Sequence, residues 1–255
     1  MTKRLPHVIA TALAAIALSA APLAAQDVST LSDAERDAFR AEVRAYLLEH
    51  PEVLMEALTI LEEREAIAAA ERDLQLVALY ADALFDSPND VVLGNPDGDI
   101  TIVEFIDYRC GFCRRAAPEL EALLAADGNI RVVIKEFPIL GEQSTLAAQF
   151  ALAARLVGGD EAYADMHYAL ISMRADMTEP NLVRLANTLG YDGEAILARI
   201  ADPRIETVIS ANYELARAME ISGTPTFVMG GQLVRGFLPA EQMAEIIEQE
   251  RASLD

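Results

Sequence analysis

Cysteine is scarce in this chain: only two are found among 255 residues, Cys110 and Cys113. Gly111 and Phe112 separate them, and no other cysteine is present with which either could form a disulfide. A disulfide between these two would close a very short loop. Such a loop constrains the unfolded chain little, so it would add little stability. The spacing therefore favours a chemical role for the pair over a bracing one.

Positive charge is also scarce. The chain carries 20 lysines and arginines against 41 aspartates and glutamates, and its formal net charge is -21. An excess of negative charge of this size argues against nucleic acid and against anionic lipid surfaces as partners. Lys135 is the only lysine beyond the first 25 residues, so arginine supplies nearly all the positive charge of the rest of the chain.

The chain lacks, beyond its start, the run of about 20 apolar residues that a membrane helix requires. Its first residues have the pattern of a secretory signal peptide: Lys3 and Arg4 are basic, residues 8–18 are apolar, and small residues lead to Ala25. We expect residues 1–25 to be removed after Ala25. The mature protein is then expected in the periplasm, without membrane insertion, where disulfides form and persist.

Residues 26–87 are predicted to form an N-terminal helical segment. Ser32 and Glu35 have the spacing of a capping box, which predicts a helix from Asp33 to about His50. Pro51 suits the first turn of a second helix. That helix is predicted to run to about residue 85, because no glycine or proline interrupts it.

The second helix has an apolar pattern that repeats every seven residues, which is typical of a coiled coil. The repeating residues are Ile60, Ile67, Leu74 and Ala81 in one seam, and Ala70, Val77 and Leu84 in another. We expect these helices to join copies of the chain into a homo-oligomer, either a dimer or a trimer. The alternative is an amphipathic helix that packs on its own domain.

Residues 88–255 are predicted to form an α/β domain with a helical insertion at about 141–219. Strand patterns alternate with helix patterns, and four or five helices follow one another in the insertion. The strands are expected at 91–93, 100–105, 130–137, 226–229 and 232–234, with a helix after the cysteines and a final helix at 239–252.

The two cysteines lie where a strand gives way to a helix. A cysteine at a helix N-terminus is close to unpaired backbone N–H groups and to the positive end of the helix dipole, which favour the thiolate. Cys110 is therefore the expected nucleophile, with a pKa below that of a free thiol. Cys113 follows one turn later and can attack a mixed disulfide held on Cys110, which releases the substrate.

Three other interpretations of the cysteine pair are open. A zinc site would need two further ligands, but no third cysteine exists, and His50 and His167 have no metal-ligand spacing. A structural disulfide is disfavoured by the short loop. Two reduced cysteines without a role fit poorly with an exported chain. We expect no metal site and no cofactor.

A second motif, Gly223-Thr224-Pro225-Thr226, directly precedes a predicted strand. Together with the run from Val103 to Cys113, it resembles the DsbA-like thiol-disulfide oxidoreductases of the thioredoxin superfamily. The N-terminal helical segment makes the likeness closest to proteins of the ScsC (suppressor of copper sensitivity) type. The resemblance covers about residues 88–252 and implies a thioredoxin fold with an inserted helical domain.

The resemblance implies roles for four further residues. Pro225 matches the cis-proline of the family, beside the cysteines, and the backbone of Thr224 would pair with an extended substrate. Glu104 matches a buried acid that could accept the proton of Cys113, with Lys135 as its candidate partner. The alternatives are an ordinary trans proline that begins a strand, and a Glu104 and Lys135 that both face solvent.

The residues between the cysteines bear on the reaction. Gly111 and Phe112 cannot stabilise a thiolate as the histidine of strongly oxidising DsbA proteins does, so the reduction potential should be lower. Gly-Phe is closer to the Gly-Tyr of related isomerases. We expect an oxidase or isomerase that exchanges disulfides with unfolded or misoxidised exported proteins, re-set by a membrane redox partner. The alternative is a copper-responsive thiol carrier that binds copper(I) through Cys110 and Cys113.

Overall fold

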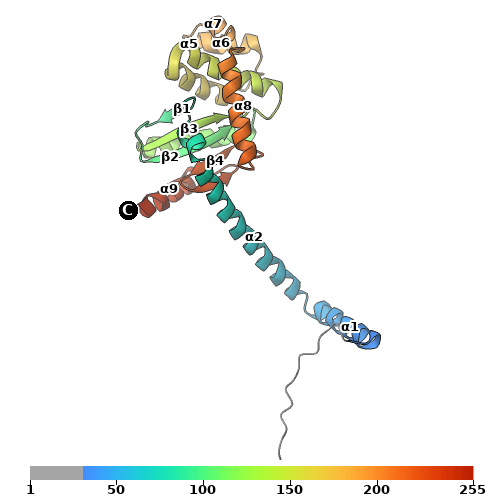
Figure 1. Cartoon of the computed structure of the whole chain (residues 1–255). Coiled ribbons are helices and arrows are strands. Elements are labelled where there is room, and N and C mark those ends of the chain that lie inside the picture. The colour runs from blue at the N-terminus through green and yellow to red at the C-terminus, as the bar shows by residue number, and fades with distance from the viewer. Residues whose placement is uncertain (1–30, 255) are drawn as a thin grey trace, which may run out of the picture. The chain divides into compact units, whose positions relative to one another are not determined.

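The computed structural model describes residues 31–254 (Figure 1). The chain divides at Leu61 into two compact units. This division is earlier than the boundary that we expected near residue 87, because residues such as Val77 and Leu84 are buried in the second unit. The expected signal peptide, residues 1–25, lies outside the described residues.

The first unit contains α1 (Asp33–Glu49) and the beginning of α2 (Glu52–Leu79). The predicted capping box is confirmed: the Ser32 N–H donates to Glu35 Oε2 at 2.9 Å, and the Glu35 N–H donates to Ser32 Oγ at 3.4 Å. No side chain of α1 is buried within this unit. Apolar side chains on both helices are therefore exposed, among them Phe39, Tyr46, Leu48, Leu54, Met55 and Leu58.

The second unit is built on a five-stranded sheet with the order β1-β3-β2-β4-β5. Strands β2 and β3 are parallel, and every other neighbouring pair is antiparallel. The strands lie close to the predicted ranges: β1 (Val91–Gly94), β2 (Ile100–Ile106), β3 (Ile130–Glu136), β4 (Thr226–Met229) and β5 (Gln232–Arg235). The helices are α3 (Ala81–Phe85), α4 (Gly111–Ala126), α5 (Glu142–Ser172), α6 (Glu179–Thr188), α7 (Gly193–Leu197), α8 (Pro203–Ala218) and α9 (Ala240–Leu254). Between residues 31 and 254, no helix has the length and apolar character needed to cross a membrane.

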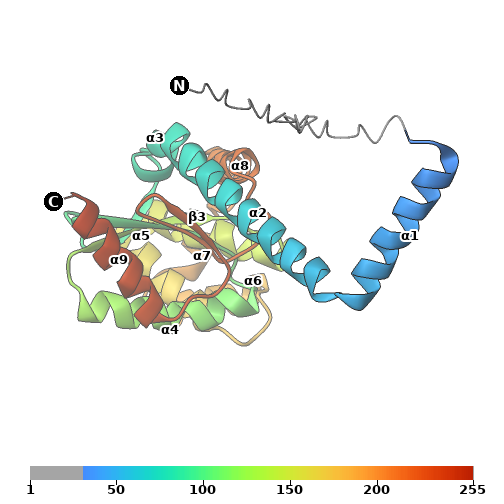
Figure 2. The same cartoon turned by 90° about the horizontal axis from the view of Figure 1, so that it is seen from below.

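Helices cover both faces of the sheet because β2 and β3 send apolar side chains to each face in alternation. Ile102 and Val132 belong to a core that includes residues of α4, α5 and α9. Val103 and Val133 face the other way and pack with Leu84 of α3 and with residues of α8. Figure 2 shows α4 and α9 on one side of the sheet, and α3 and α8 on the other.

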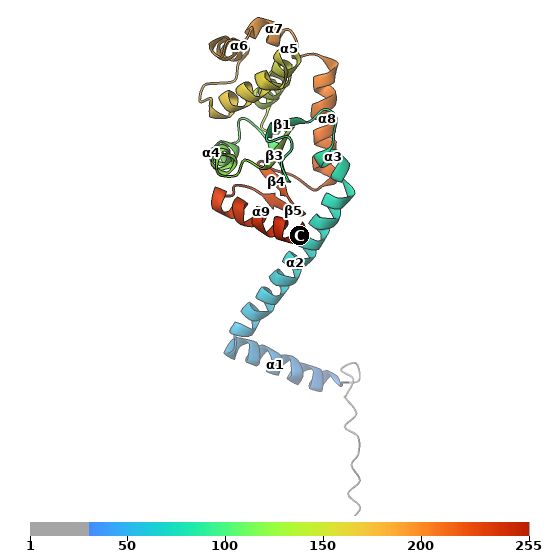
Figure 3. The ribbon, with the colours of Figure 1, turned by 90° about the vertical axis from the view of Figure 1, so that its left-hand side faces the viewer.

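The predicted helical insertion is confirmed by α5, α6, α7 and α8. Gly159 adopts a φ of 78° inside α5, in the left-handed region that glycine tolerates, and it divides that helix into two stretches. Figure 3 shows α5, α6 and α7 gathered together at the top, on the β1 side of the sheet.

The prediction of one uninterrupted helix to about residue 85 is wrong. The helix α2 ends at Leu79, and Tyr80 takes a φ of -106° and a ψ of 19° before α3 begins. Leu84 of α3 is fully buried against the sheet, and the Ala83 carbonyl accepts a hydrogen bond from Lys135 Nζ at 2.7 Å. These tertiary contacts override the local preference for a continuous helix.

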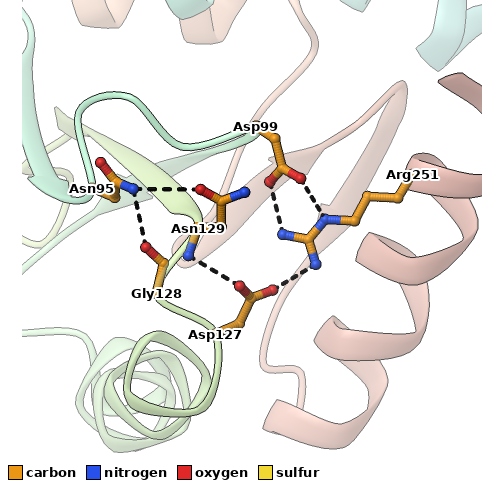
Figure 4. Close-up of polar contacts among 6 residues, drawn as sticks. All are labelled: Asn95, Asp99, Asp127, Gly128, Asn129 and Arg251. Atoms are coloured by element: carbon orange, nitrogen blue, oxygen red, sulfur yellow. Dashed lines mark hydrogen bonds and ion pairs between the residues drawn. The ribbon is translucent and has the colours of Figure 1, made fainter.

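An ion-pair network fastens α9 to the end of the sheet far from the cysteines (Figure 4). The Arg251 guanidinium donates to both carboxylate oxygens of Asp99, at 2.7 and 2.9 Å, and to Asp127 Oδ2 at 2.7 Å. Asp99 directly precedes β2 and Asp127 caps α4, so one side chain holds three elements together. The opposite end of α4, which begins at Cys110, takes no part in this network.

Candidate redox site

The turn between β2 and α4 places Cys110 at the helix start. Cys110 is the N-cap of α4, as predicted from the sequence. Asp107 shapes this turn: its carboxylate accepts hydrogen bonds from the backbone N–H of Arg109 at 2.7 Å and of Leu140 at 2.9 Å. The Cys110 N–H donates to the Asp107 carbonyl at 3.0 Å. The conformation of the turn thus depends on Asp107, for which the sequence analysis predicts no role.

The two cysteines are free thiols with different surroundings. The exposed fraction is 6 % for Cys110 and 0 % for Cys113. The loop before β4 reaches the first of them: Cys110 Sγ lies 3.0 Å from the Thr224 carbonyl oxygen, to which the thiol donates a hydrogen bond while it keeps its proton. The Thr224–Pro225 peptide bond is cis, as the family resemblance implied.

The pKa of Cys110 is lowered to about 5. The largest cause is a hydrogen bond from the Cys113 thiol, which stabilises the thiolate. The Thr224 hydroxyl and the backbone N–H groups of Cys113 and Phe112 act in the same direction, while partial burial opposes them. At neutral pH Cys110 is therefore a thiolate, the form that attacks a disulfide.

Cys113 shifts in the opposite direction. Burial raises its pKa most, and the hydrogen bond to Cys110 and the negative charge of Glu104 raise it further. Cys113 consequently keeps its proton while Cys110 is ionised. The pair has one ready nucleophile and one thiol that must lose a proton before it can act.

Glu104 of β2 lies inside the molecule near Cys113. It is 2 % exposed, and burial raises its pKa to about 8, with further contributions from the negative charges of Glu136 and Cys110. A small cavity of about 10 Å³ lies between this strand and the helices, lined by Glu104, His167 and Tyr168 among others. This is at the lower limit of the space that one water molecule needs. Glu104 therefore has the position and the pKa to exchange a proton with Cys113.

Lys135 is not the partner of Glu104, and that expectation is wrong. Its ammonium group pairs with Asp90 and donates to the Ala83 carbonyl. The reason is the register of β2 and β3: Glu104 lies opposite Ile134, so Lys135, the next residue of β3, faces away from it. Burial lowers the pKa of Lys135, and burial raises that of Asp90.

A second buried acid, Glu136, was not predicted from the sequence. Its Oε1 accepts hydrogen bonds from the hydroxyls of Tyr108 at 2.7 Å and Tyr163 at 2.6 Å. Tyr108 also lies 3.1 Å from Nδ1 of His167. Burial raises the pKa of Glu136 to about 8, against the effect of the two tyrosines. Its position at the end of an otherwise buried strand, next to Lys135, was the signal that could have revealed it.

A groove of about 290 Å³ opens beside the cis-proline loop. Phe112 forms part of its wall, with 54 % of that side chain exposed, and Phe237, Thr224 and Pro225 line it as well. The Arg115 guanidinium lies 4.4 Å from the centre of the Phe112 ring and 5.4 Å from that of Phe237. The groove therefore offers apolar rings and backbone groups next to the reactive sulfur. Gly111 begins the helix and has no neighbour within 4 Å of the position that a Cβ would take.

Two protein-family models match the chain. The model of the DSBA-like thioredoxin domain covers residues 101–248, and that of the copper resistance protein ScsC N-terminal domain covers residues 35–68. The first spans the cysteines, the helical insertion and the cis-proline. The second falls on α1 and α2.

The solved structures that resemble this chain include a thioredoxin-like oxidoreductase and an ScsC protein. A thioredoxin-like oxidoreductase from Silicibacter pomeroyi DSS-3 is 42 % identical, with a TM-score of 0.63 over 67 % of this chain and 97 % of that one. ScsC of Proteus mirabilis in a transitional conformation is 26 % identical, with a TM-score of 0.64 over 88 % of this chain and 100 % of that one. The predicted thioredoxin fold is thus confirmed.

Similarity also extends to part of a transporter. The Na(+)/H(+) antiporter NhaA 1 of Salinispora arenicola is 29 % identical over 162 residues, which are 64 % of this chain. The chain spans only about a quarter of the length of that antiporter.

Proposed function

Because the chain belongs to the family of DsbA-like thioredoxin domains, we propose that it is a periplasmic thiol-disulfide oxidoreductase that acts on exported polypeptides. The observation that carries this proposal is the asymmetry of the two cysteines. Cys110 has a lowered pKa and lies against the Thr224 carbonyl, whereas Cys113 is buried and has a raised pKa. A pair of this kind divides attack and release between two sulfurs.

In the reducing direction, the Cys110 thiolate attacks one sulfur of a substrate disulfide and forms a mixed disulfide, and the other substrate sulfur leaves as a thiolate. Where Glu104 is ionised, Cys113 then loses its proton to this carboxylate and attacks Cys110. The Cys110–Cys113 disulfide forms, and the first substrate sulfur leaves as a thiolate. The reverse sequence oxidises two substrate thiols and leaves both cysteines reduced.

The groove beside the cis-proline loop fits an unfolded chain. Phe112 and Phe237 offer apolar contact, and the backbone at Thr224 can pair with an extended segment as an added strand. An unfolded or misoxidised polypeptide presents both features, since its backbone is unpaired and its apolar side chains are exposed. A membrane redox partner would use the same groove to re-set the cysteine pair.

Residues 31–61 support assembly of several copies. The apolar side chains of this unit are exposed within it, and the match to the ScsC N-terminal domain falls on the same helices. A homo-oligomer would bury this surface and hold several cysteine pairs near one substrate. Gly111 and Phe112 between the cysteines favour a potential milder than that of strong oxidants, which suits an isomerase as well as an oxidase.

A reaction with a scrambled disulfide protein tests the proposal. The mature chain should restore activity to scrambled ribonuclease, and Cys110→Ser should abolish this. Cys113→Ala is the matched control, because it should still form the mixed disulfide but release it slowly. Isomerisation by the Cys110→Ser protein at the wild-type rate would refute the role of Cys110.

The second candidate function is a copper-responsive thiol carrier. It is favoured by the match to the copper resistance protein ScsC N-terminal domain and by two thiols that soft copper(I) would bind. Within the described part of the chain, no group of three or more histidine, cysteine or acidic side chains is arranged to hold a metal. Calorimetric titration of the reduced protein with copper(I), beside an insulin-reduction assay, separates the functions. Tight binding without exchange activity would select the carrier.

A further inference from the structure

A second pocket has a volume of about 440 Å³. Residues of α4 and of the C-terminal end of α5 line it, and three of them are arginines: Arg114, Arg115 and Arg174. Glu121 is the one acidic residue of the lining. Three cations around one pocket stand out in a chain whose formal net charge is -21.

Arg115 links the pocket to the groove. This residue lines the pocket, and its guanidinium stacks on Phe112 and Phe237, which line the groove. A polypeptide that lies in the groove beside Cys110 could therefore extend a side chain past Arg115 into the pocket.

The positive charges of the pocket are available to a ligand. Arg114 uses its Nε to donate to the Tyr108 carbonyl at 3.0 Å, which leaves its terminal nitrogens free, and Arg174 is exposed. Among residues 31–254, no ion pair includes any of the three arginines. Some arginines elsewhere are paired, as Arg251 is with Asp99 and Asp127.

We propose that this pocket is a subsite for an acidic side chain of the polypeptide substrate, near the cysteine that reacts with Cys110. The proposal rests on the thiol-disulfide exchange proposed above. A guanidinium group matches a carboxylate with two parallel hydrogen bonds. Glu121 in the wall disfavours a ligand with two or more charges, so a single aspartate or glutamate fits better than a phosphate dianion. The rest of the chain is strongly acidic and would repel an acidic segment of a substrate. The three arginines of the pocket would therefore determine where such a segment binds.

Two disulfide-containing peptides test this subsite. They differ only in one residue beside the reactive cysteine, which is aspartate in one and asparagine in the other. The reduced full mature chain reacts with each, and stopped-flow fluorescence gives the second-order rate constants. We expect the wild type to prefer the acidic peptide by about three- to tenfold, and 300 mM NaCl should bring this ratio toward one.

Charge reversal at the pocket has a matched control on the same helical insertion. Arg174→Glu should lower the ratio of acidic to neutral rate constants below one. Arg184→Glu changes the net charge equally, but it lies on α6, exposed and outside the pocket lining, so it should leave the ratio as in the wild type. A wild-type ratio of one, or equal effects of the two variants, would overturn the subsite while exchange itself stands. A wild type that reacts with neither peptide would overturn the subsite and the proposed function together.

Discussion

The carbonyl oxygen of Thr224 lies 3.0 Å from Sγ of Cys110, although 114 positions separate the two residues in the chain. This contact depends on the loop that precedes β4. The Gly236 N–H holds the loop by donating to the Pro225 carbonyl at 2.8 Å, and Thr226 Oγ1 donates to the Gly223 carbonyl at 2.8 Å. A substrate sulfur bound to Cys110 would thus lie directly beside the backbone of Thr224.

The ionisation of Cys110 should depend on Cys113. Thiolate absorbance of the reduced wild type should titrate with a midpoint near pH 5, in accord with the lowered pKa of Cys110. Cys113→Ala removes the hydrogen bond that lowers this pKa most, so its midpoint should move to higher pH. The rate of alkylation by iodoacetamide should follow the same curves. Identical midpoints in the two proteins would mean that the helix start alone sets the pKa.

Glu104 should reduce stability as the pH rises. Its folded pKa is about 8, above that of an unfolded glutamate. The unfolded chain therefore releases this proton first, and the free energy of unfolding should fall between about pH 4.5 and pH 8, by up to about 1.4 kcal/mol per pH unit. Glu104→Gln should make this slope less steep in urea titrations at several pH values, while Glu136, whose pKa is also raised to about 8, keeps its own contribution. An unchanged slope would mean that Glu104 does not hold its proton in the folded protein.

The same substitution should also slow release of the substrate. Glutamine cannot accept the Cys113 proton, so breakdown of the mixed disulfide should slow by about 100-fold, the lower range for loss of a general base. Formation of the mixed disulfide by Cys110 should slow far less. Rapid acid quench followed by mass spectrometry measures the two steps separately, and equal slowing of both steps would contradict the assignment.

Lys135 should matter for stability and not for redox chemistry. It is 1 % exposed and paired with Asp90, so Lys135→Met leaves a buried carboxylate without its partner and should cost about 3 kcal/mol of unfolding free energy. Adding Asp90→Asn should restore most of that loss. Because Lys135 faces away from Glu104, the reduction potential of the double variant should equal that of the wild type. A change of about 30 mV or more would revive the expected pairing with Glu104.

The sequence alone was sufficient to predict the site residues that belong to short local motifs. Cys110 and Cys113 follow a strand and open a helix, and Thr224 and Pro225 precede a hairpin; each of these features shows in a short stretch of residues. The start of α1 at its capping box and the limits of the strands follow from local signals in the same way, whereas the end of α2 at Leu79 does not. The resemblance to a family then connected the two distant motifs.

The partners of the buried charged residues could not be predicted from the sequence, because they depend on strand register and on residues far apart in the chain. Whether Lys135 meets Glu104 or Asp90 is decided by which face of β3 it takes, and a shift of one residue reverses that face. Oε1 of Glu136 accepts hydrogen bonds from Tyr108 and Tyr163, which lie 28 and 27 residues away from it. No local pattern reports such contacts.

The two seams of the second helix have different surroundings, and this permits a test of assembly. Val77 and Leu84 of one seam are buried in the second unit, whereas Ile60, Ile67 and Leu74 of the other are about half exposed or more. One side of the helix therefore packs on its own domain, and the other side is available for contact between copies of the chain. We expect the exposed seam and the apolar residues of α1 to join copies of the chain.

Two deletions should separate assembly from folding. Removing residues 26–61 should convert the mature protein from an oligomer to a folded monomer, measured by light scattering, with little change in the unfolding of the second unit. Removing residues 26–86 should also destroy the contacts of Val77 and Leu84 and the carbonyl that binds Lys135. Burial of two aliphatic side chains contributes about 1.5–3 kcal/mol each, so this shorter protein should lose about 3–6 kcal/mol of unfolding free energy. A mature chain that is monomeric before any deletion would refute the assembly, and equal stability of the two shortened proteins would refute the packing of α3 on the sheet.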